Sequence, residues 1–319
     1  MKIIYFANFK EKQSDRTEQH IKKALEELGH EVIPIQEEEY EKISQVKNAD
    51  LFLFHKAGVG RILTEQQFVK LLCYISCPKV CWYFDKILPE REEFIAVTVN
   101  YADYVFVTDD TYRRRHRFKN MFCLRQGIGE KHSTVQLMDY ECDVAFVGGV
   151  YSQERMDFVT ELAKYYGDKF KVFNNDFNQD LASLCSTAKV IVAPPFLAND
   201  FYWSSRIYMI LGSGGFLIHP ELYGLKEEFE EGKHYVGYKR LEELIPTIDY
   251  FLRRPEAREA IKKQGFRQCW SVATYKHRVK SMLKTINGNK TSTGAIKHPK
   301  QTNKTKKKGR GTNESITNG

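Results

Sequence analysis

One stretch of the sequence, residues 201–236, contains residue types that could bind a diphosphate. Arg206 follows Ser204 and Ser205, and a serine oxygen in this place can accept hydrogen bonds from the first backbone N–H groups of a helix. A helix N-terminus with an arginine offers backbone donors and a guanidinium to the same anion. The alternative is an ordinary helix–turn–strand unit with a surface arginine, and these residues alone leave both interpretations open.

Glycines soon after Arg206 should keep this helix short. Three of them, starting at Gly212, would end the helix within about two turns. The apolar run at 216–219 then predicts a buried strand, which Pro220 stops. The candidate diphosphate site in this stretch comprises Ser205, Arg206, Gly214 and Gly215.

Repeating strand and helix patterns must position these residues. The first half of the chain predicts short apolar strands at 2–7, 31–35, 50–55, 79–84 and 104–108. The pattern restarts after a polar stretch at 129–140, with strands at 143–147, 170–173 and 189–193. Near-continuous apolar strands that alternate with helices predict parallel sheets covered by helices on both faces.

The polar stretch divides the chain into two α/β domains. We expect Rossmann-like domains at residues 1–135 and 141–287, facing a cleft. Helical patterns at 241–253, 256–264 and 271–285 complete the second domain. The remaining segment, 288–319, has hardly any large apolar side chain, so we expect a disordered tail. Its eight basic residues and one acid carry a net +7 of the chain's formal +8, which leaves the folded part nearly neutral.

Cysteine spacing and hydropathy restrict the compartment and the cofactors. The seven cysteines follow no disulfide-framework spacing, which is typical of a reducing compartment. Cys73, Cys77 and Cys81 are four residues apart and lack the paired spacing of a zinc site, so we expect no metal site. No apolar run approaches about 18 residues, and none near the start fits a signal peptide. We therefore expect a cytoplasmic protein without a membrane span.

Ligands of open parallel sheets bind beyond the carboxyl ends of the strands, and several candidate residues lie there. Gly148 and Gly149 precede a helix whose first N–H groups could face a phosphate, so this turn and Arg206 should face one anion. Asn174 could bind a nucleobase edge, and Tyr202 could stack on a base or sugar. A turn asparagine and a core aromatic would give the same pattern.

The run from Ser205 to Pro220, SRIYMILGSGGFLIHP, resembles the C-terminal domain of group 1 glycosyltransferases, with its nearest likeness in the CgeB-like subfamily. The resemblance continues through residues 224–238 and on to Arg278, over most of the second half. One position departs from the pattern, because Met209 stands where many relatives have a glutamate that binds the donor ribose.

This resemblance implies a GT-B architecture of two Rossmann-like domains facing a cleft. It implies a nucleotide-diphosphate sugar as co-substrate, with no cofactor and no metal. Arg155 matches an arginine in the family's helix opening, although an exposed salt bridge is the alternative for it. The donor-binding residues would then be Gly148, Gly149, Arg155, Asn174, Tyr202, Ser205, Arg206, Gly214 and Gly215.

The first domain should bind the acceptor, which the sequence leaves open as a glycan, a small molecule or a nucleic acid. Asp85 and His55 follow strands, and Asp85 resembles the strand end W-x-x-D of the family. An inverting enzyme needs a base for the acceptor hydroxyl, and there Asp85 is the first candidate and His55 the second. A retaining enzyme would use these residues only to orient the acceptor.

Three other functions compete with this prediction. Met209 raises the possibility of an inactive relative that binds a nucleotide sugar without transfer. The Lys-rich tail could contact nucleic acid or another polyanion, which would suit transfer to a modified nucleic-acid base. A sensor built from two α/β domains is the third, and it requires no alignment of Arg206 with Gly149 across one cleft.

Overall fold

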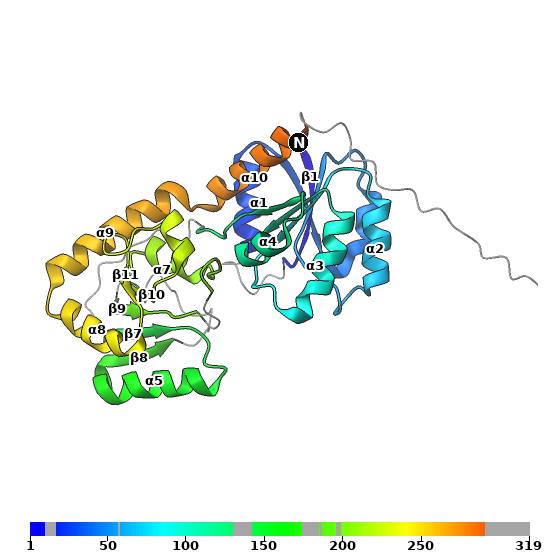
Figure 1. The fold of residues 1–319 in the computed structure, drawn as a ribbon. Helices are drawn as coiled ribbons and strands as arrows, with labels where there is room; N and C mark the ends of the chain where they lie inside the picture. The colour runs from blue at the N-terminus through cyan, green and yellow to red at the C-terminus, as the bar shows by residue number, and fades with distance from the viewer. Residues whose placement is uncertain are drawn as a thin grey trace, which may run out of the picture.

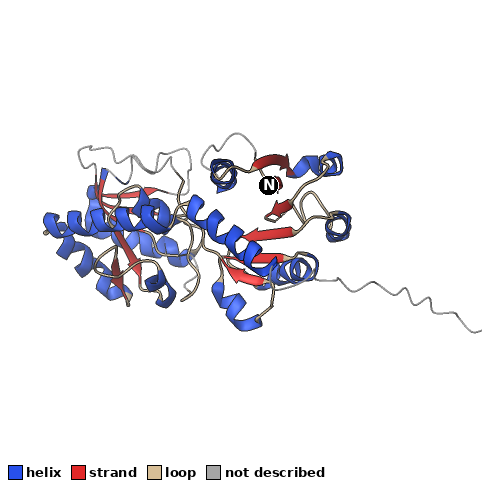
Figure 2. Cartoon of the chain, turned by 90° about the horizontal axis from the view of Figure 1, so that it is seen from above, coloured by secondary structure: helices blue, strands red, loops and turns tan. Residues whose placement is uncertain are grey.

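The computed structural model describes residues 1–9, 17–56, 58–129, 142–173, 185, 187–195 and 199–290. These residues form two α/β lobes, each built on its own parallel sheet (Figure 1). Helices lie on both sides of each sheet (Figure 2). The predicted fold class of two Rossmann-like domains is confirmed.

The first sheet has six strands in the order β2-β1-β3-β4-β5-β6. Its strands are β1 (Lys2–Ala7), β2 (Glu31–Gln36), β3 (Leu51–Phe54), β4 (Lys79–Tyr83), β5 (Tyr104–Val107) and β6 (Met121–Cys123). Every residue of β3 and β4 is buried, as expected for strands that helices cover on both faces. Consequently the domain has an apolar core on each side of the sheet.

The helices of this domain are α1 (Thr17–Glu27), η1 (Glu37–Gln45), α2 (Glu65–Tyr74), α3 (Pro89–Tyr101) and α4 (Asp110–His116). Two of them, α2 and α4, begin at a residue whose side chain caps the first turn. The hydroxyl of Thr64 accepts from the backbone N–H of Gln67 at 3.2 Å, and the Gln67 side chain accepts from Thr64. Pro89 opens α3 at a position where its missing N–H costs nothing.

The second sheet has five strands in the order β11-β10-β9-β7-β8. They are β7 (Cys142–Val147), β8 (Phe170–Phe173), β9 (Ala188–Val192), β10 (Leu217–Pro220) and β11 (Val236–Tyr238). Around them lie α5 (Gln153–Tyr166), η3 (Gly167–Lys169), α7 (Arg206–Gly212), η4 (Tyr223–Glu227), η5 (Leu241–Glu243), α8 (Leu244–Leu252) and α9 (Pro255–Val272). All pairings are parallel, so the carboxyl ends of these strands share one edge.

The last helix, α10 (Tyr275–Lys290), returns to the first domain. Its residues Tyr275, Val279 and Met282 are buried in one core with Ile21 and Leu25 of α1. Figure 1 shows α10 running from the end of α9 to lie beside α1. The helix continues past Gly288, where we expected the tail to begin, and residues 291–319 lie outside the described residues.

Candidate functional site

The turn after β7 brings backbone groups of the second sheet to its carboxyl edge. The N–H of Gly148 donates to the carbonyl of Phe173 at the end of β8, at 3.0 Å. Ser152 caps the next helix, α5, because its hydroxyl accepts from the N–H of Arg155 at 3.3 Å. The ring of Tyr151 lies over Gly149, where a Cβ would be 2.0 Å from Tyr151 Cε2. The glycine pair therefore forms a tight turn, and a side chain at Gly149 would require the ring of Tyr151 to move.

Arg155 is buried in this turn, which excludes the exposed salt bridge that we considered as its alternative. Its guanidinium donates from Nη1 to the carbonyl of Gly149 and from Nη2 to the carbonyl of Pro194. Burial lowers the pKa of Arg155. The side chain thus ties the turn after β7 to the end of β9 and places a cation at the sheet edge.

Arg206, the first residue of α7, directs its guanidinium at the same turn. A Cβ at Gly148 would lie 3.2 Å from Nη1 of Arg206 and 3.2 Å from Nη1 of Arg155. Burial and the neighbouring cation of Arg155 lower the pKa of Arg206 to about 10. We call Arg155 and Arg206 the arginine pair. Two cations held together at a glycine turn favour an anion that offsets their repulsion.

The N-terminus of α7 differs from the prediction. Ser205 has helical backbone angles and its side chain makes no capping hydrogen bond, so the predicted serine cap is wrong for this residue. Its backbone N–H instead donates to Oε1 of Gln126 at 3.2 Å, in the segment that leaves the first domain. The contribution of Ser205 is therefore to join the two domains behind the arginine pair.

Gly214 and Gly215 lie at the opposite end of α7 from Arg206, so the structure does not bring them to the proposed diphosphate site. Gly214 has a φ of +75°, a conformation that glycine adopts without strain. A Cβ at Gly215 would lie 2.7 Å from Cδ1 of Ile191 in the core. The glycines shape a buried turn before β10, and our assignment of them to donor binding is corrected.

Tyr202 lies at the boundary between the domains. Burial and the carboxylate of Asp85 raise the pKa of Tyr202 to about 12, while a hydrogen bond from the backbone of Lys86 and the cation of Arg206 act in the opposite direction. The hydroxyl of Tyr202 thus lies within electrostatic range of Asp85 in the first domain and of Arg206 in the second. The next residue, Trp203, is a core aromatic whose ring packs under the guanidinium of Arg125 at 3.9 Å.

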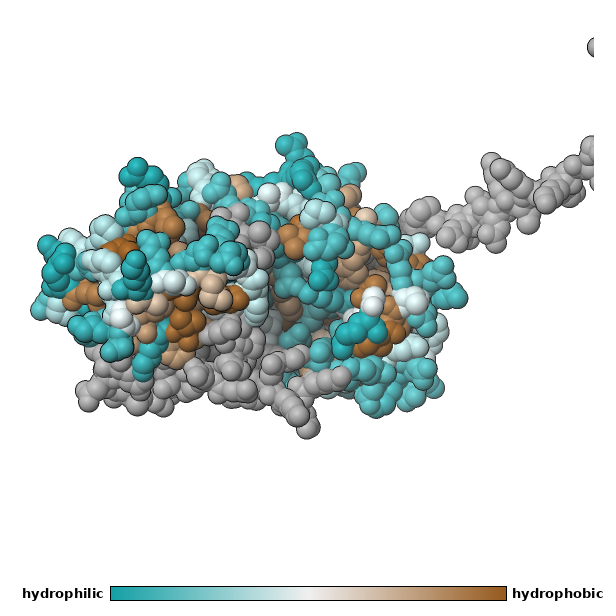
Figure 3. Space-filling model, turned by 90° about the horizontal axis from the view of Figure 1, so that it is seen from below, coloured by the Kyte–Doolittle hydropathy of each residue, from teal (hydrophilic) through white to brown (hydrophobic). Residues whose placement is uncertain are grey.

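The segment around Phe201 is attached to the first domain by its backbone. The carbonyl of Phe201 accepts from Nη1 of Arg125 at 2.6 Å and from the N–H of Asp110 at 3.2 Å. The surface is hollowed between the two lobes (Figure 3). These contacts fix the segment before α7 to the first domain.

Asp85 is exposed at the end of β4, and its carboxylate pairs with the ammonium of Lys56. An exposed carboxylate that follows a strand of the first sheet is accessible to an acceptor molecule. Asp85 also lies within electrostatic range of Tyr202, at the boundary with the second domain. Asn174, which we expected beside the donor, lies outside the described residues.

His55 is not placed to act as a base. The ring is buried, with Nδ1 2.7 Å from the carbonyl of Trp82 and Nε2 2.5 Å from the hydroxyl of Tyr5. Burial lowers the pKa of His55 to about 4, so the ring is neutral at pH 7. With both nitrogens occupied inside the core, His55 is a structural residue, and our second candidate for the base is corrected.

Two further residues, Tyr151 and His219, lie at the edge of the second sheet. Tyr151 covers the glycine turn, and its signal in the sequence is its place two residues after Gly149. His219, at the end of β10, donates from Nδ1 to the carbonyl of Pro220 at 2.7 Å. Burial and the nearby Arg206 lower the pKa of His219 to about 4, so a neutral imidazole lies near the arginine pair.

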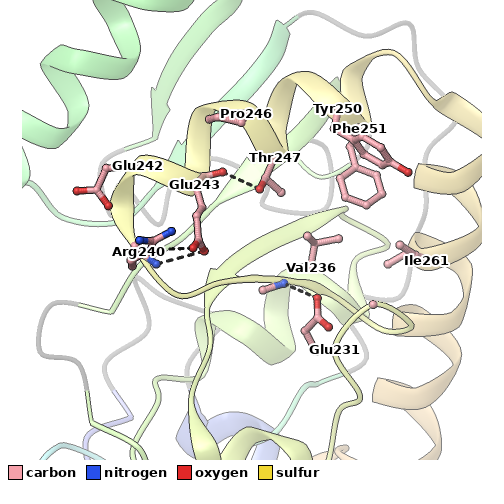
Figure 4. Close-up of a pocket in the computed structure, with 12 residues that line it drawn as sticks. Glu231, Val236, Arg240, Glu242, Glu243, Pro246, Thr247, Tyr250, Phe251 and Ile261 are labelled. Atoms are coloured by element: carbon pink, nitrogen blue, oxygen red, sulfur yellow. Dashed lines mark hydrogen bonds and ion pairs between the residues drawn. The ribbon is translucent and has the colours of Figure 1, made fainter.

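A separate groove of about 600 Å³ flanks the edge strand β11 (Figure 4). Its rim includes Glu231 and Glu243, and the side chain of Glu243 accepts from Nε of Arg240 at 3.0 Å. Oε1 of Glu231 accepts from the N–H of Gly237 at 3.1 Å and so occupies part of the strand edge. None of the residues that we assigned to the site lines this groove.

Two searches of the described residues concern metals and membranes. Across the described ranges, no group of three or more histidine, cysteine, aspartate or glutamate residues is arranged to hold a metal ion. Likewise, no helix in the part of the chain that the structure describes has the length and apolar character needed to cross a membrane.

Comparison with known proteins places the fold. Residues 144–284 match a family model described as glycosyl transferase-like. The structure is similar to sucrose-phosphate synthase from Thermosynechococcus elongatus, with a TM-score of 0.66 and 14% identity over 92% of this chain and 100% of the other. It is also similar to Anabaena HepE in complex with UDP and glucose, with a TM-score of 0.61 and 11% identity over 90% and 100% of the two chains.

A third similar structure is a glycosyltransferase from Rickettsia africae, with a TM-score of 0.61 and 10% identity over 90% of this chain and 98% of the other. No curated protein matches the sequence. The two lobes thus have the GT-B fold of glycosyltransferases. The matched segment contains most of β7, the arginine pair and β10. It therefore includes the carboxyl edge of the second sheet with the arginine pair, which we call the cationic edge.

Proposed function

We propose that the protein is a glycosyltransferase that transfers a sugar from a nucleotide-diphosphate donor to an acceptor hydroxyl. The convergence of the arginine pair on Gly148 is the observation that supports this most strongly. Guanidinium groups match phosphate oxygens with paired donors, and here two of them lie at one glycine turn. The likeness of the second half to CgeB-like proteins belongs to the same proposal.

The proposed reaction breaks the bond between the sugar C1 and the diphosphate oxygen. The diphosphate leaves with the bonding electrons, and Arg206 stabilises the negative charge that grows on it. The acceptor oxygen forms the new bond to C1, and its proton passes to the carboxylate of Asp85. Because the arginine pair supplies the countercharge, the proposed mechanism uses no metal ion.

UDP is the first nucleotide to test as the leaving group, since the similar HepE structure contains UDP and glucose. The exposed thiol of Cys73 and the partly exposed thiols of Cys77 and Cys123 are free, which fits our placement of the protein in the cytoplasm. The acceptor would bind to the first domain.

A thermal-shift panel of UDP, GDP, ADP and their glucose conjugates tests the proposal. A ligand that binds only the native state stabilises it by about 2.7 kcal/mol at a concentration 100 times its Kd, so Tm should rise with one nucleotide of the panel. Release of the free nucleoside diphosphate from the corresponding sugar conjugate should follow on incubation. A panel with no shift would contradict the proposal, and binding without release would favour the inactive relative.

A further inference from the structure

A pocket of about 250 Å³ opens in the first domain, close to Asp85. It lies between the loop after β3, the end of β4 and the helices α2 and α3, and its lining includes Lys56, Glu65, Tyr83, Glu90, Arg91 and Phe94. We call it the Tyr83 pocket. Lys56 connects it to the candidate base, because the ammonium of this lysine pairs with the carboxylate of Asp85.

The hydroxyl of Tyr83 carries the inference. The residue is 1% exposed, and its hydroxyl makes no hydrogen bond with the part of the protein that the structure describes. A buried polar group without a partner costs about 1–3 kcal/mol, so such a group in a native structure calls for a ligand or a water. Burial and the carboxylate of Asp85 raise the pKa of Tyr83, which keeps the hydroxyl protonated as both donor and acceptor.

The size and the aromatic wall of the pocket limit what can bind. Its volume falls below the range of about 300–1,000 Å³ that holds drug-sized ligands. The rings of Tyr83 and Phe94 lie 6.0 Å apart, and Phe68 stacks on Phe94 at 5.7 Å. A small ring with one apolar face would fit against them.

The charges of the lining disfavour a strongly anionic occupant. Glu65, Glu90 and Glu93 contribute three carboxylates, against the two cations of Lys56 and Arg91. This mixture offers donors and acceptors in nearly equal number and a slightly negative balance. Hydroxyl groups, which both donate and accept, satisfy such a lining without an uncompensated charge.

We infer that the Tyr83 pocket binds the acceptor of the proposed transfer, as a neutral polyol of about one sugar ring that hydrogen-bonds to the Tyr83 hydroxyl. This inference rests on the proposed function. The hydroxyl that attacks the donor would emerge beside Lys56 and reach Asp85. Tyr83 is then a positioning residue, because it holds the acceptor and takes no part in proton transfer.

The test measures binding of neutral polyols by saturation-transfer NMR on the full chain. The probes are methyl α-glucoside, methyl α-galactoside, methyl α-mannoside and myo-inositol, with glucose 6-phosphate as the anionic comparison. At least one neutral probe should bind, and glucose 6-phosphate should bind more weakly than that probe. Tyr83→Phe should lower the affinity for the neutral probe by about 2- to 10-fold, which is the effect of losing one hydrogen bond between neutral groups.

Tyr83→Phe should fold, because the deleted hydroxyl has no partner among the described residues, and its Tm should stay unchanged or rise. Tyr74→Phe, at a tyrosine of α2 that is 65% exposed, is the matched control and should bind the probes as the wild type does. Equal affinity of the wild type and Tyr83→Phe, or no binding of any neutral probe, would overturn the inference.

UDP binding on the same samples separates this inference from the proposed function. Tyr83→Phe should bind UDP with wild-type affinity, because the arginine pair lies in the other domain. UDP binding without polyol binding would reject only the acceptor pocket. Polyol binding that depends on Tyr83, without binding of any nucleotide, would reject the donor site and retain the pocket.

Discussion

The carboxyl edges of the two sheets are built in opposite ways. At the edge of the second sheet, buried or partly buried cations converge, because Arg155 and Arg206 both reach Gly148. At the edge of the first sheet, the histidine is enclosed in the core and the carboxylate of Asp85 is exposed. A pre-organised cationic edge suits an anion that must bind firmly, and an open edge suits an acceptor that must enter and leave.

The edge of the first sheet offers a cation in a different situation. Lys56 is the cation nearest the candidate base, and it is already paired with Asp85. Tyr202 lies between Asp85 and Lys86 of the first domain and Arg206 of the second. The backbone carbonyl of Phe201 adds a connection to Arg125 and Asp110 of the first domain. The difference between the two edges supports the proposal that the donor binds to the second domain and the acceptor to the first.

Asp85→Asn should have the largest effect on turnover. It should separate the role of the first edge in the reaction from the role of the second edge in binding the donor. If Asp85 takes the acceptor proton, turnover should fall by about 100- to 10,000-fold, the usual contribution of a general base. UDP affinity should not change, because the arginine pair is untouched. Steady-state release of UDP measures the first quantity and calorimetry the second.

The matched control for this experiment is Asp168→Asn, at an exposed aspartate of η3 in the second domain. It should keep wild-type turnover. Turnover of Asp85→Asn within threefold of the wild type would contradict the assignment of the base and would suit a retaining enzyme.

The pH dependence of stability tests whether the ring of His55 is buried in the core at the first edge. The folded pKa of His55, about 4, lies below the ordinary 6.5, so the folded state binds fewer protons than the unfolded state between these pH values. The free energy of unfolding should therefore fall as pH drops through this window, by about 2 kcal/mol from this residue between pH 7 and 5. Urea unfolding at the two pH values measures the loss.

His55→Gln should remove that part of the pH dependence, whatever its effect on stability at pH 7. His116→Gln, at an exposed histidine of α4, is the control for the substitution itself. A loss of stability between pH 7 and 5 that is the same in His55→Gln and wild type would show that the ring is accessible, and would restore it as a candidate base.

Arg206 and His55 show why the sequence predicted the edge of the second sheet better than the edge of the first. Arg206 and Gly148 were expected to face one anion because strand ends of a parallel sheet share an edge, and the structure brings them together. The same rule placed His55 and Asp85 at an edge but could not say which side chain turns inward. The hydroxyl of Tyr5, which engages His55, lies 50 residues away in sequence.

Glycines were the other source of error. The sequence alone does not distinguish a glycine that lies against a ligand from a glycine that forms a buried turn. Gly214 and Gly215 were assigned to the ligand, but they form a buried turn. We expected a helix to end before Gly265, yet α9 runs through it to Val272. A Cβ at Gly265 would lie 2.3 Å from the carbonyl of His234, so this glycine serves packing between α9 and the loop before β11.

Deletion of residues 291–319 should have the smallest effect on the folded protein. The tail lacks apolar residues to bury, so Tm should change by less than about 1 °C. Binding to DNA should lose its steep salt dependence, because most of the basic residues of the tail are removed. If the shortened chain bound DNA with an unchanged salt slope, the polyanion site would lie on the folded domains, and the cationic edge would be the place to examine.

The comparison of the two edges depends most on Arg206, and calorimetric titration of UDP into wild type and Arg206→Ala tests it directly. The variant should bind UDP with about 1.5–3 kcal/mol less free energy, the range for a hydrogen bond to a charged group, or roughly 10- to 100-fold more weakly. Arg206→Lys should recover only part of the loss, since an ammonium cannot make the paired contact. Arg254→Ala, at an exposed arginine that packs on Tyr250, should bind as the wild type does. Equal UDP affinities for wild type and Arg206→Ala would contradict the assignment of the donor to the cationic edge.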